Sequence, residues 1–192
     1  MTVFDARDIP AIGLLHDEGL RAAVVRTWEA ALSRSPYASL AEVPQSPFMA
    51  ERSLLDHVNE VNERTIDMFQ LAVTHYALVV DHDLALATAI LHDVDKPLIY
   101  RRDVTGFGYA KGTRLGDHGA LGAQLCLTHG VPATVAEMVR VHSPFASTGL
   151  PPTPEGTLVH YADFVSNDLA CLQQGAAPIH ASFRLVPKEG TH

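Results

Sequence analysis

The stretch Ala89-Ile-Leu-His-Asp-Val-Asp-Lys-Pro97 joins an apolar run to a dense group of polar side chains. Its apolar half predicts a short buried helix from Leu84 to Asp93, which Pro97 ends. Adjacent side chains on a regular helix point about 100° apart, so His92 and Asp93 can share a ligand only where the helix ends. A carboxylate can bridge two cations, and we therefore expect Asp93 to be the shared ligand of a dinuclear metal site.

Most of the remaining sequence shows helical periodicity, and we expect an all-α fold in which the helices form one compact bundle. Ser53 and Asp83 are placed to cap the helices that follow them, because both residue types favour helix N-termini. Two stretches rich in proline, residues 36–47 and 143–156, interrupt the pattern and predict loops. The expected helices are Glu18–Ser33, Leu54–Leu78, Leu84–Asp93, Asp117–Thr128, Pro132–His142 and Thr157–Leu172.

Residues Leu98–Arg114 differ from this helical pattern. They contain glycines among several aromatic residues, and we interpret the segment as a loop with room for a short hairpin. The segment is also the most basic part of the chain, and arginine side chains suit bidentate contacts with phosphate. A solvated charged loop without a ligand is the alternative. The candidate substrate-binding residues in this segment are Arg101, Arg102, Lys111 and Arg114.

The charge balance limits the class of partner. The 192 residues carry a formal net charge of −8, which argues against binding a nucleic-acid polymer, since such binding needs a basic face. A small anionic substrate is compatible with this charge, because a bound metal pair would dominate the local field. The sequence leaves open whether the chain forms a homodimer.

Length and composition indicate one folded domain with short appendages. We divide the chain into an N-terminal helical extension and loop (1–47), a main domain (48–174) and a C-terminal tail (175–192). No uncharged apolar run reaches the roughly 18 residues of a membrane span, and no apolar stretch follows a basic start as in a signal peptide. The two cysteines lie far apart, so we expect both to be reduced in a cytoplasmic protein that binds no membrane.

Histidine and aspartate recur on separate predicted helices. Helical bundles build metal sites from inward side chains on facing helices, so this distribution predicts one site in the core of the bundle. Mixed nitrogen and oxygen ligands suit two transition-metal ions with positions left open for water and substrate. We expect iron first, with manganese, cobalt, nickel or zinc as alternatives. The candidate ligands are His57, His92, Asp93, His118, His142 and Asp163.

The His-Asp dipeptide carries little weight by itself, because the chain contains it twice more, as His16-Asp17 and His82-Asp83. We interpret both of these pairs as solvated or capping residues at helix starts. His160 lies three residues before Asp163 and could orient a ligand, but a surface or satisfied core histidine is the interpretation we favour. The prediction therefore depends on the full series in its order, not on one dipeptide.

This order of residues resembles the HD-domain superfamily of metal-dependent phosphohydrolases, over the range Ser53–Asp168. The four-histidine version resembles the dinuclear members of the superfamily, and the resemblance implies a compact HD-domain helical bundle. In such families the first histidine, the His-Asp pair and the last aspartate bind one or both metals, and two further histidines complete the second site. By this resemblance the first group is His57, His92, Asp93 and Asp163, and the added pair is His118 and His142.

The resemblance also implies a reaction. A metal pair lowers the pKa of bound water and so provides hydroxide at neutral pH, and Asp93 would hold both ions. Lys96 lies one helical turn past Asp93, where it could neutralise charge on a phosphate in the transition state, and His-Asp-x-x-Lys matches several phosphohydrolases of this superfamily. An exposed lysine near a helix end is the alternative. We expect hydrolysis of a nucleotide or another small phosphate ester.

Two other functions are compatible with the same residues. Mixed-valent di-iron oxygenases of the superfamily use this ligand series to cleave a small polyol or a phosphonate, and Lys96 does not discriminate between the two reactions. A non-catalytic regulatory domain would not require all of the ligands to be present. The cyclic-dinucleotide branch is not assigned, because its Gly-Tyr-Pro element after a His-His is replaced here by His142-Ser143-Pro144.

Overall fold

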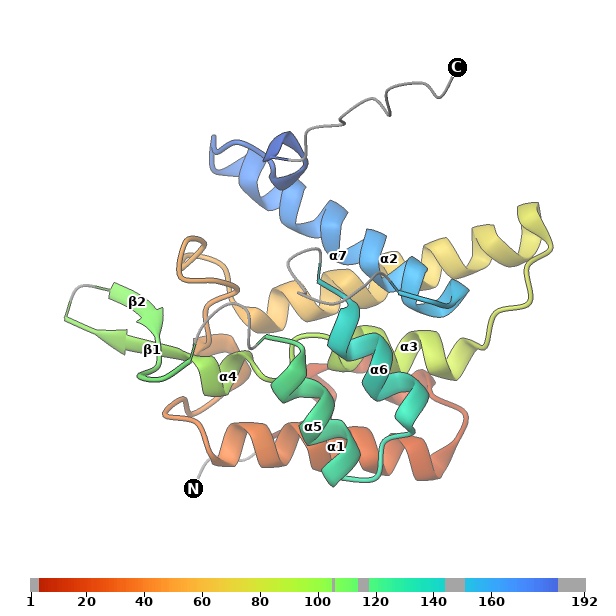
Figure 1. Cartoon of the computed structure of the whole chain (residues 1–192), viewed down its shortest axis with the longest axis horizontal. Helices are drawn as coiled ribbons and strands as arrows, with labels where there is room; N and C mark the ends of the chain where they lie inside the picture. Colours follow the sequence, from red (N-terminus) through yellow and green to blue (C-terminus); the bar gives the residue numbers. More distant parts are fainter. Residues whose placement is uncertain (1–3, 105, 114–117, 144–150, 183–192) are drawn as a thin grey trace, which may run out of the picture.

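A computed structural model describes residues 4–104, 106–113, 118–143 and 151–182 of the chain. The body of the molecule is a helical bundle, which confirms the predicted fold class, and a small hairpin projects from one end of it (Figure 1). In chain order the elements are α1 (Glu18–Ser33), α2 (Leu54–Tyr76), α3 (His82–Leu91), α4 (Lys96–Ile99), β1 (Tyr100–Asp103), β2 (Gly106–Tyr109), α5 (Ala120–Thr128), α6 (Ala133–Val141) and α7 (Pro154–Gln173).

Helix α3 lies at the centre of the bundle, and α1, α2, α6 and α7 pack around it (Figure 1). Every residue from Ala85 to Leu91 is buried, so α3 is apolar on all sides, in contrast to an amphipathic surface helix. Four of these seven positions are alanine or threonine, and such small side chains let several helices approach closely. The end of α3 therefore delivers His92 and Asp93 to the middle of the molecule.

Capping residues determine where the helices begin. Ser53 accepts a hydrogen bond from the backbone N–H of Asp56 at the start of α2, as predicted. The predicted cap of α3 is wrong: Asp81 caps this helix, which begins two residues earlier than predicted. Thr153 caps α7, so this helix also begins earlier, at Pro154, where a proline is tolerated in the first turn.

Helix α5 begins later than predicted, at Ala120. Gly119 precedes it with a φ of +83°, a conformation that residues with a Cβ rarely adopt, and His118 lies in the same turn. Asp117, the predicted first residue of this helix, is outside the described residues. The other helix predictions agree with the structure to within a few residues, and α1 has the predicted bounds.

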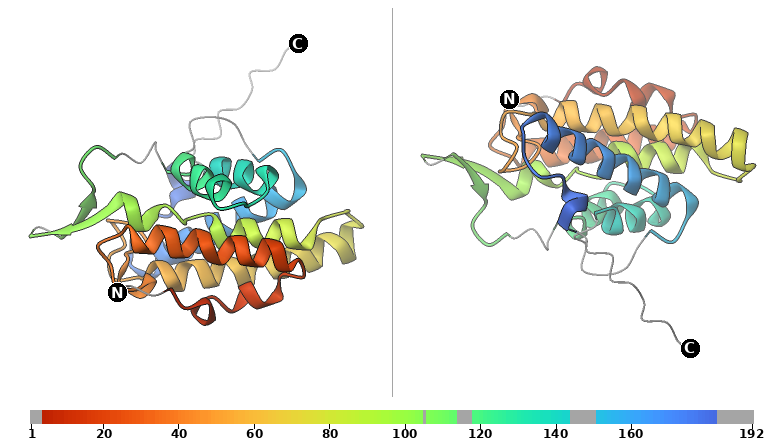
Figure 2. Two further views of the ribbon diagram at one scale, coloured as in Figure 1. Left: turned by 90° about the horizontal axis from the view of Figure 1, so that it is seen from below. Right: turned by 90° about the horizontal axis from the view of Figure 1, so that it is seen from above.

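The glycine-containing segment after α4 forms the short hairpin for which the sequence leaves room. Strands β1 and β2 pair antiparallel, with Tyr100 opposite Tyr109 and Asp103 opposite Gly106. The two tyrosine rings pack with their centroids 5.6 Å apart. Figure 2 shows in both of its views that the hairpin extends away from the helices, so only its base lies beside the bundle.

The N-terminal segment packs closely on the rest of the chain. Trp28 of α1 is fully buried, together with Ile9 and Leu15, in the same apolar core as α3. The loop before α2 is held by a β-bridge between Pro44 and Ser53. The proposed division of the chain at residue 47 stays a prediction. Among the described residues, apolar side chains from both sides of residue 47 pack into the same core. Within the same residues, every helix is too short or too polar to cross a lipid bilayer.

Candidate metal centre

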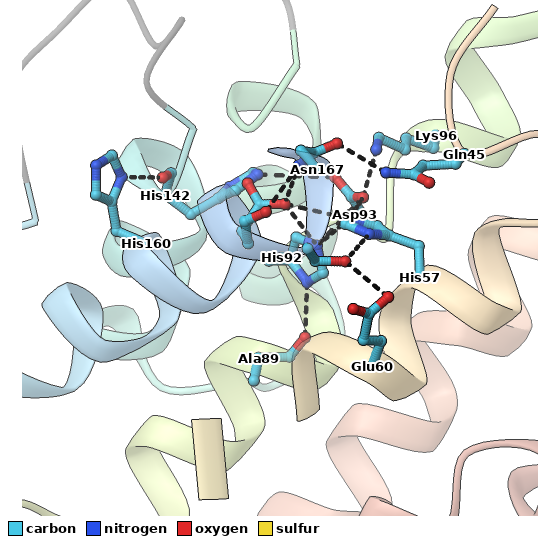
Figure 3. Close-up of polar contacts among 12 residues, drawn as sticks. Gln45, His57, Glu60, Ala89, His92, Asp93, Lys96, His142, His160 and Asn167 are labelled. Atoms are coloured by element: carbon cyan, nitrogen blue, oxygen red, sulfur yellow. Dashed lines mark hydrogen bonds and ion pairs between the residues drawn. The ribbon is translucent and has the colours of Figure 1, made fainter. Parts of the chain in front are cut away.

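The predicted series of histidines and aspartates meets at the C-terminal end of α3 in two buried clusters; Figure 3 labels four of these residues, His57, His92, Asp93 and His142. The first cluster consists of His57 from α2, His92 from the end of α3 and Asp163 from α7. The second cluster consists of Asp93, His118 and His142. Within each cluster the potential ligand atoms lie within 4.8 Å of one another. The structure thus brings together all six of the candidate ligands.

Asp93 lies between the two clusters and turns one carboxylate oxygen toward each. Its Oδ2 atom lies 3.1 Å from Nε2 of His57 and 3.2 Å from Nε2 of His92. Its Oδ1 atom lies 3.1 Å from Nε2 of His118 and 3.7 Å from Nε2 of His142. This is the placement that a carboxylate needs in order to bridge two cations.

The Nδ1 atoms of two of these histidines have partners that fix the tautomer. Nδ1 of His92 donates to the carbonyl of Ala89 over 2.7 Å, and Nδ1 of His142 donates to the carbonyl of Val139 over 2.6 Å. Because a carbonyl can only accept, each neutral ring keeps a lone pair on Nε2. Metal-binding histidines commonly use their second nitrogen in this way.

The lone pairs that result have no protein donor. Nε2 of His142 is buried without a hydrogen-bond partner, and Oδ2 of Asp93 has only the ammonium group of Lys96 beside it as a donor. Nε2 of His92 lies 3.2 Å from Nε2 of His57, so two ring nitrogens face each other. Unsatisfied buried acceptors are costly, and a cation between them would satisfy them all. The donor set therefore fits metal ions.

His57 is oriented by a serine that sequence analysis did not identify. Nδ1 of His57 lies 3.1 Å from Oγ of Ser166, and this hydroxyl donates to Oε2 of Glu60 over 3.1 Å. Since the hydroxyl proton is used on Glu60, Ser166 accepts from Nδ1 of His57. His57 thus also presents its Nε2 lone pair to the first cluster.

A second chain of hydrogen bonds orients Asp163. Asn167, one turn further along α7, donates to Oδ1 of Asp163 over 2.7 Å. Gln45 donates to Oδ1 of Asn167 over 2.7 Å and accepts from Arg52 over 3.1 Å. Arg52 also pairs with Glu60, so the two series of hydrogen bonds close into a ring around the first cluster. No periodicity or motif marks these polar residues in the sequence, and they lie in a loop and on separate helices.

His118 has a carboxylate on each of its ring nitrogens. Nδ1 donates to Oδ1 of Asp95 over 2.9 Å, and the backbone N–H of Gly119 donates to the other oxygen of Asp95 over 2.8 Å. Burial alone would lower the pKa of His118, but Asp95 and Asp93 raise it to about 10. Asp95 was not among the predicted site residues, although it stands only two residues after Asp93 in the sequence.

Lys96 is buried beside Asp93, not exposed at a helix end. Its Nζ atom lies 2.5 Å from Oδ2 of Asp93, and only 7% of the residue is exposed. Burial would raise the pKa of Asp93, but the neighbouring His92 ring and the Lys96 ammonium hold it well below its usual range. The neighbouring rings of His57 and His92 likewise lower the pKa of Asp163 against the effect of burial. Both carboxylates are therefore ionised at neutral pH.

A cavity of about 270 Å³ opens beside the two clusters. Its polar side is formed by Asp93, Lys96, His118 and Asp163, and most of its remaining wall is apolar or aromatic. Both terminal segments contribute to it, since Ser46 precedes the predicted main domain and Ile179 follows it. The rest of the lining is Phe48, Met49, Tyr100, Tyr109, Ser143, Phe164, Asn167 and Cys171.

The structure does not bring the predicted arginines of the hairpin to this cavity. Arg101 and Arg102 line a different hollow with Tyr37 and Glu42, and Arg101 donates to nearby backbone carbonyls. The guanidinium of Arg102 lies 5.5 Å from the ring centre of Phe107. Lys111 is exposed, and Arg114 lies outside the described residues. Their role in substrate binding stays a prediction.

His160 points away from the two clusters. Its Nδ1 atom donates to the backbone carbonyl of His142 over 2.6 Å (Figure 3). The side chain is half-buried between α7 and the end of α6. It is thus a satisfied histidine, as predicted, and it holds the backbone of a candidate ligand.

One curated protein is similar to this chain over part of its length. The chain is 31% identical over 114 residues to the dihydroneopterin 2',3'-cyclic phosphate phosphodiesterase of Methanocaldococcus jannaschii. The alignment covers 59% of this chain and 45% of the relative, so the chain spans less than half of the relative's length. No solved structure matches the chain significantly.

The chain also matches a known family, over the region of the site. Residues 57–168 match the family described as the HD domain, and they make up more than half of the chain. The matched range begins at His57 and includes all of the candidate ligands, together with Lys96 and Asp95. This chain therefore belongs to the HD domain family.

Proposed function

We propose that this chain is a metal-dependent phosphohydrolase that cleaves a small phosphate ester. The observation that carries the proposal is the position of Asp93, whose two oxygens face two separate buried clusters of histidine and aspartate. Membership of the HD domain family supports it, and so does the similarity to a protein named as a phosphodiesterase. That similarity also favours hydrolysis over the oxygenase alternative.

We propose that the two clusters hold two metal ions, with Asp93 as the ligand common to both. When bound, such a pair acts as a Lewis acid toward phosphoryl oxygens and makes water nucleophilic at neutral pH. Histidine and carboxylate ligands accept several first-row metals, and iron remains the ion that we expect first, ahead of manganese, cobalt, nickel and zinc.

The residues of the chain itself supply positioning and charge. Lys96 lines the cavity and is held beside Asp93, so its ammonium group can offset negative charge that develops on a phosphoryl oxygen. Tyr100 also lines the cavity, and burial together with the charge of Asp93 raises its pKa far above the ordinary range. Its hydroxyl therefore stays protonated and can donate a hydrogen bond to an anionic substrate.

The cavity favours a substrate with one charged end and one apolar, ring-shaped end. The metal clusters and Lys96 lie at its polar side, whereas Phe48, Phe164 and Tyr109 are available to pack against a planar ring. The relative's name specifies a 2',3'-cyclic phosphate of a pterin compound. We therefore propose a nucleotide or a similar heteroaromatic phosphate ester as the substrate class. The homodimer stays a prediction.

The test is hydrolysis by protein whose metal content is known. The protein is purified without oxygen, its metals are quantified, and phosphate release or ring opening is measured with nucleoside monophosphates and 2',3'-cyclic phosphates. We expect activity with iron, manganese or cobalt, and its loss in His92→Ala and Asp93→Ala. The exposed His75 gives a matched control, because His75→Ala removes a histidine outside the site.

The same preparation distinguishes the oxygenase alternative. A mixed-valent di-iron EPR signal that changes when substrate is added, with oxygen consumed and no phosphate ester hydrolysed, would contradict the proposal. Full metal content and full activity in Asp163→Ala would contradict the proposed ligand set itself.

A further inference from the structure

A third group of potential metal ligands lies at the opposite end of α3, in two of the His-Asp pairs that the main site does not use. We call this group the distal cluster; it consists of His16, His82 and Asp83. Nδ1 of His16 and Nδ1 of His82 each lie 2.9 Å from the same oxygen, Oδ1 of Asp83. The two imidazole rings lie 4.7 Å apart, centre to centre. Two nitrogens and one oxygen thus converge on one point from two separate segments of the chain.

The carboxylate of the distal cluster is held in place by the backbone. Oδ2 of Asp83 accepts hydrogen bonds from the N–H groups of His16 and Asp17, over 2.9 and 2.7 Å. The ring of His82 packs edge-on against Phe69 of α2, with the ring centres 5.4 Å apart. Two of the three donors therefore have a fixed orientation before any ligand binds, which reduces the entropic cost of binding.

The surroundings of the distal cluster favour a cation. A surface hollow contains the three residues, and Asp17 and Asp81 also line it. No lysine or arginine contributes to this hollow among the described residues. The side chain of His16 is 78% exposed, whereas that of Asp83 is 15% exposed. An ion can therefore enter from solvent and keep water ligands while it contacts a largely buried carboxylate.

We propose that the distal cluster is a separate binding site for one divalent ion of the zinc, nickel or copper type. Bonds of about 2.0–2.2 Å from zinc to nitrogen and oxygen place tetrahedral ligands roughly 3.4 Å apart. The present nitrogen–oxygen distances of 2.9 Å need to open only slightly to admit the ion. Without the ion each Nδ1 carries the proton that it donates to Asp83; when the ion binds through Nδ1, each neutral ring takes its proton on Nε2 instead, so no proton is released overall.

The site is independent of the metal centre in position and in effect. The ten residues of α3 separate the two, which corresponds to about 15 Å along the helix. An ion at the distal cluster would tie the segment before α1 to the start of α3. We therefore expect it to raise the melting temperature and to leave hydrolysis unchanged.

The experiment compares zinc binding by wild type, His16→Ala and His75→Ala. Metal-free protein is dialysed to equilibrium against excess zinc, and bound metal is counted per chain. His16→Ala is expected to bind one equivalent fewer than wild type, whatever number the metal centre holds. The exposed His75 is again the matched control, and His75→Ala is expected to bind as wild type does. Metal-free melting temperatures check that both variants fold.

A thermal readout makes the test independent of stoichiometry. At about a hundredfold excess of zinc over the dissociation constant, one ion raises the melting temperature of a chain of this size by roughly 5–10 °C. We expect the part of the zinc-induced increase that comes from the distal cluster to be absent in His16→Ala and present in wild type and His75→Ala. Equal zinc content and equal thermal shifts in all three proteins would overturn the proposal and leave the distal cluster as a hydrogen-bonded clamp. Equal losses of bound zinc in His16→Ala and His75→Ala would overturn the proposal as well, since they would indicate nonspecific binding.

Discussion

Asp95 is a buried carboxylate that contacts a candidate ligand but does not line the cavity. It accepts from Nδ1 of His118 and thereby directs Nε2 of that ring toward Asp93. A carboxylate on the second nitrogen of a metal-binding histidine also increases the basicity of the ring. We infer that Asp95 is a positioning residue for the second cluster.

Replacing this carboxylate tests the inference. Asp95→Asn keeps the shape of the side chain but removes its charge, so we expect metal affinity to fall about 10-fold to 100-fold. Activity should fall at limiting metal and recover when metal is in excess, which separates positioning from a direct role in the reaction. Asp67→Asn, on the exposed face of α2, is the control. Unchanged metal affinity in Asp95→Asn would contradict the role assigned to this residue.

The sequence predicted the candidate ligands better than it predicted what supports them. His57 and Asp163 lie 106 positions apart, yet their order in a recognisable series was enough to place them in one site. Asp95 and Gln45 carry no such pattern, because a supporting hydrogen bond can come from any polar residue that the fold brings near. Only the packing of the loop before α2 against α7 identifies Gln45.

At the scale of single elements, the turn before α5 determines where His118 lies. Gly119 has a φ of +83°, and a Cβ at this position would lie 2.7 Å from the backbone oxygen of Arg140. Gly119→Ala therefore has to distort the turn, at a cost of about 1–3 kcal/mol. We expect urea unfolding to show this loss in the free energy of unfolding. We also expect the variant to bind metal more weakly.

Gly108→Ala in β2 is the matched control for the turn, since a Cβ there meets no atom within 4 Å. We expect its free energy of unfolding to stay within about 0.5 kcal/mol of wild type. An equally small change in Gly119→Ala would mean that the turn can move without disturbing α5.

The packing of α5 also predicts how its cysteine reacts. Burial, with a contribution from the charge of Asp95, raises the pKa of the Cys126 thiol to about 12. In a Cys171→Ala background, alkylation of native protein should be roughly 500-fold slower at pH 9 than that of unfolded protein, because the thiolate is the reactive form. The native rate should keep rising through about pH 11, whereas the unfolded rate levels off by about pH 10. A native rate that levels off there too would contradict the raised pKa.

The boundaries of the elements show which local signals were sufficient. Helix α1 has its predicted bounds because Asp17 caps it and its apolar residues follow one face. The start of α3 was misplaced because Asp81 and Asp83 both stand where a cap is expected, and only the contact of Asp83 with the backbone of His16 decides between them. Local sequence signals therefore identified the helices, whereas a tertiary contact fixed the start of α3.

At the scale of the whole molecule, the ring of polar contacts around the first cluster joins the loop before α2 to α7. Gln45 is fully buried within it and contacts both Asn167 and Arg52. Gln45→Ala would remove one buried hydrogen bond from each partner, and we expect a loss of about 1–3 kcal/mol in the free energy of unfolding. Metal retention should fall as well, because Asn167 holds Asp163.

Gln70→Ala is the comparison for this variant, because Gln70 is an exposed glutamine on α2. Chemical denaturation and metal content should both stay close to wild type in Gln70→Ala. If Gln45→Ala behaves in the same way, the loop does not depend on this ring for its position.

The burial of α3 on every side predicts the order in which parts of the molecule unfold. Amide protons of a helix that is enclosed by four others exchange with solvent deuterium only when the whole domain unfolds. The amides of α2 beyond Leu71, where the helix is exposed, should exchange faster. We expect the amides of Ala87 to Leu91 to exchange most slowly. His92 and Asp93 follow directly on this slowest segment, so local fraying elsewhere would leave the anchor of the metal centre intact.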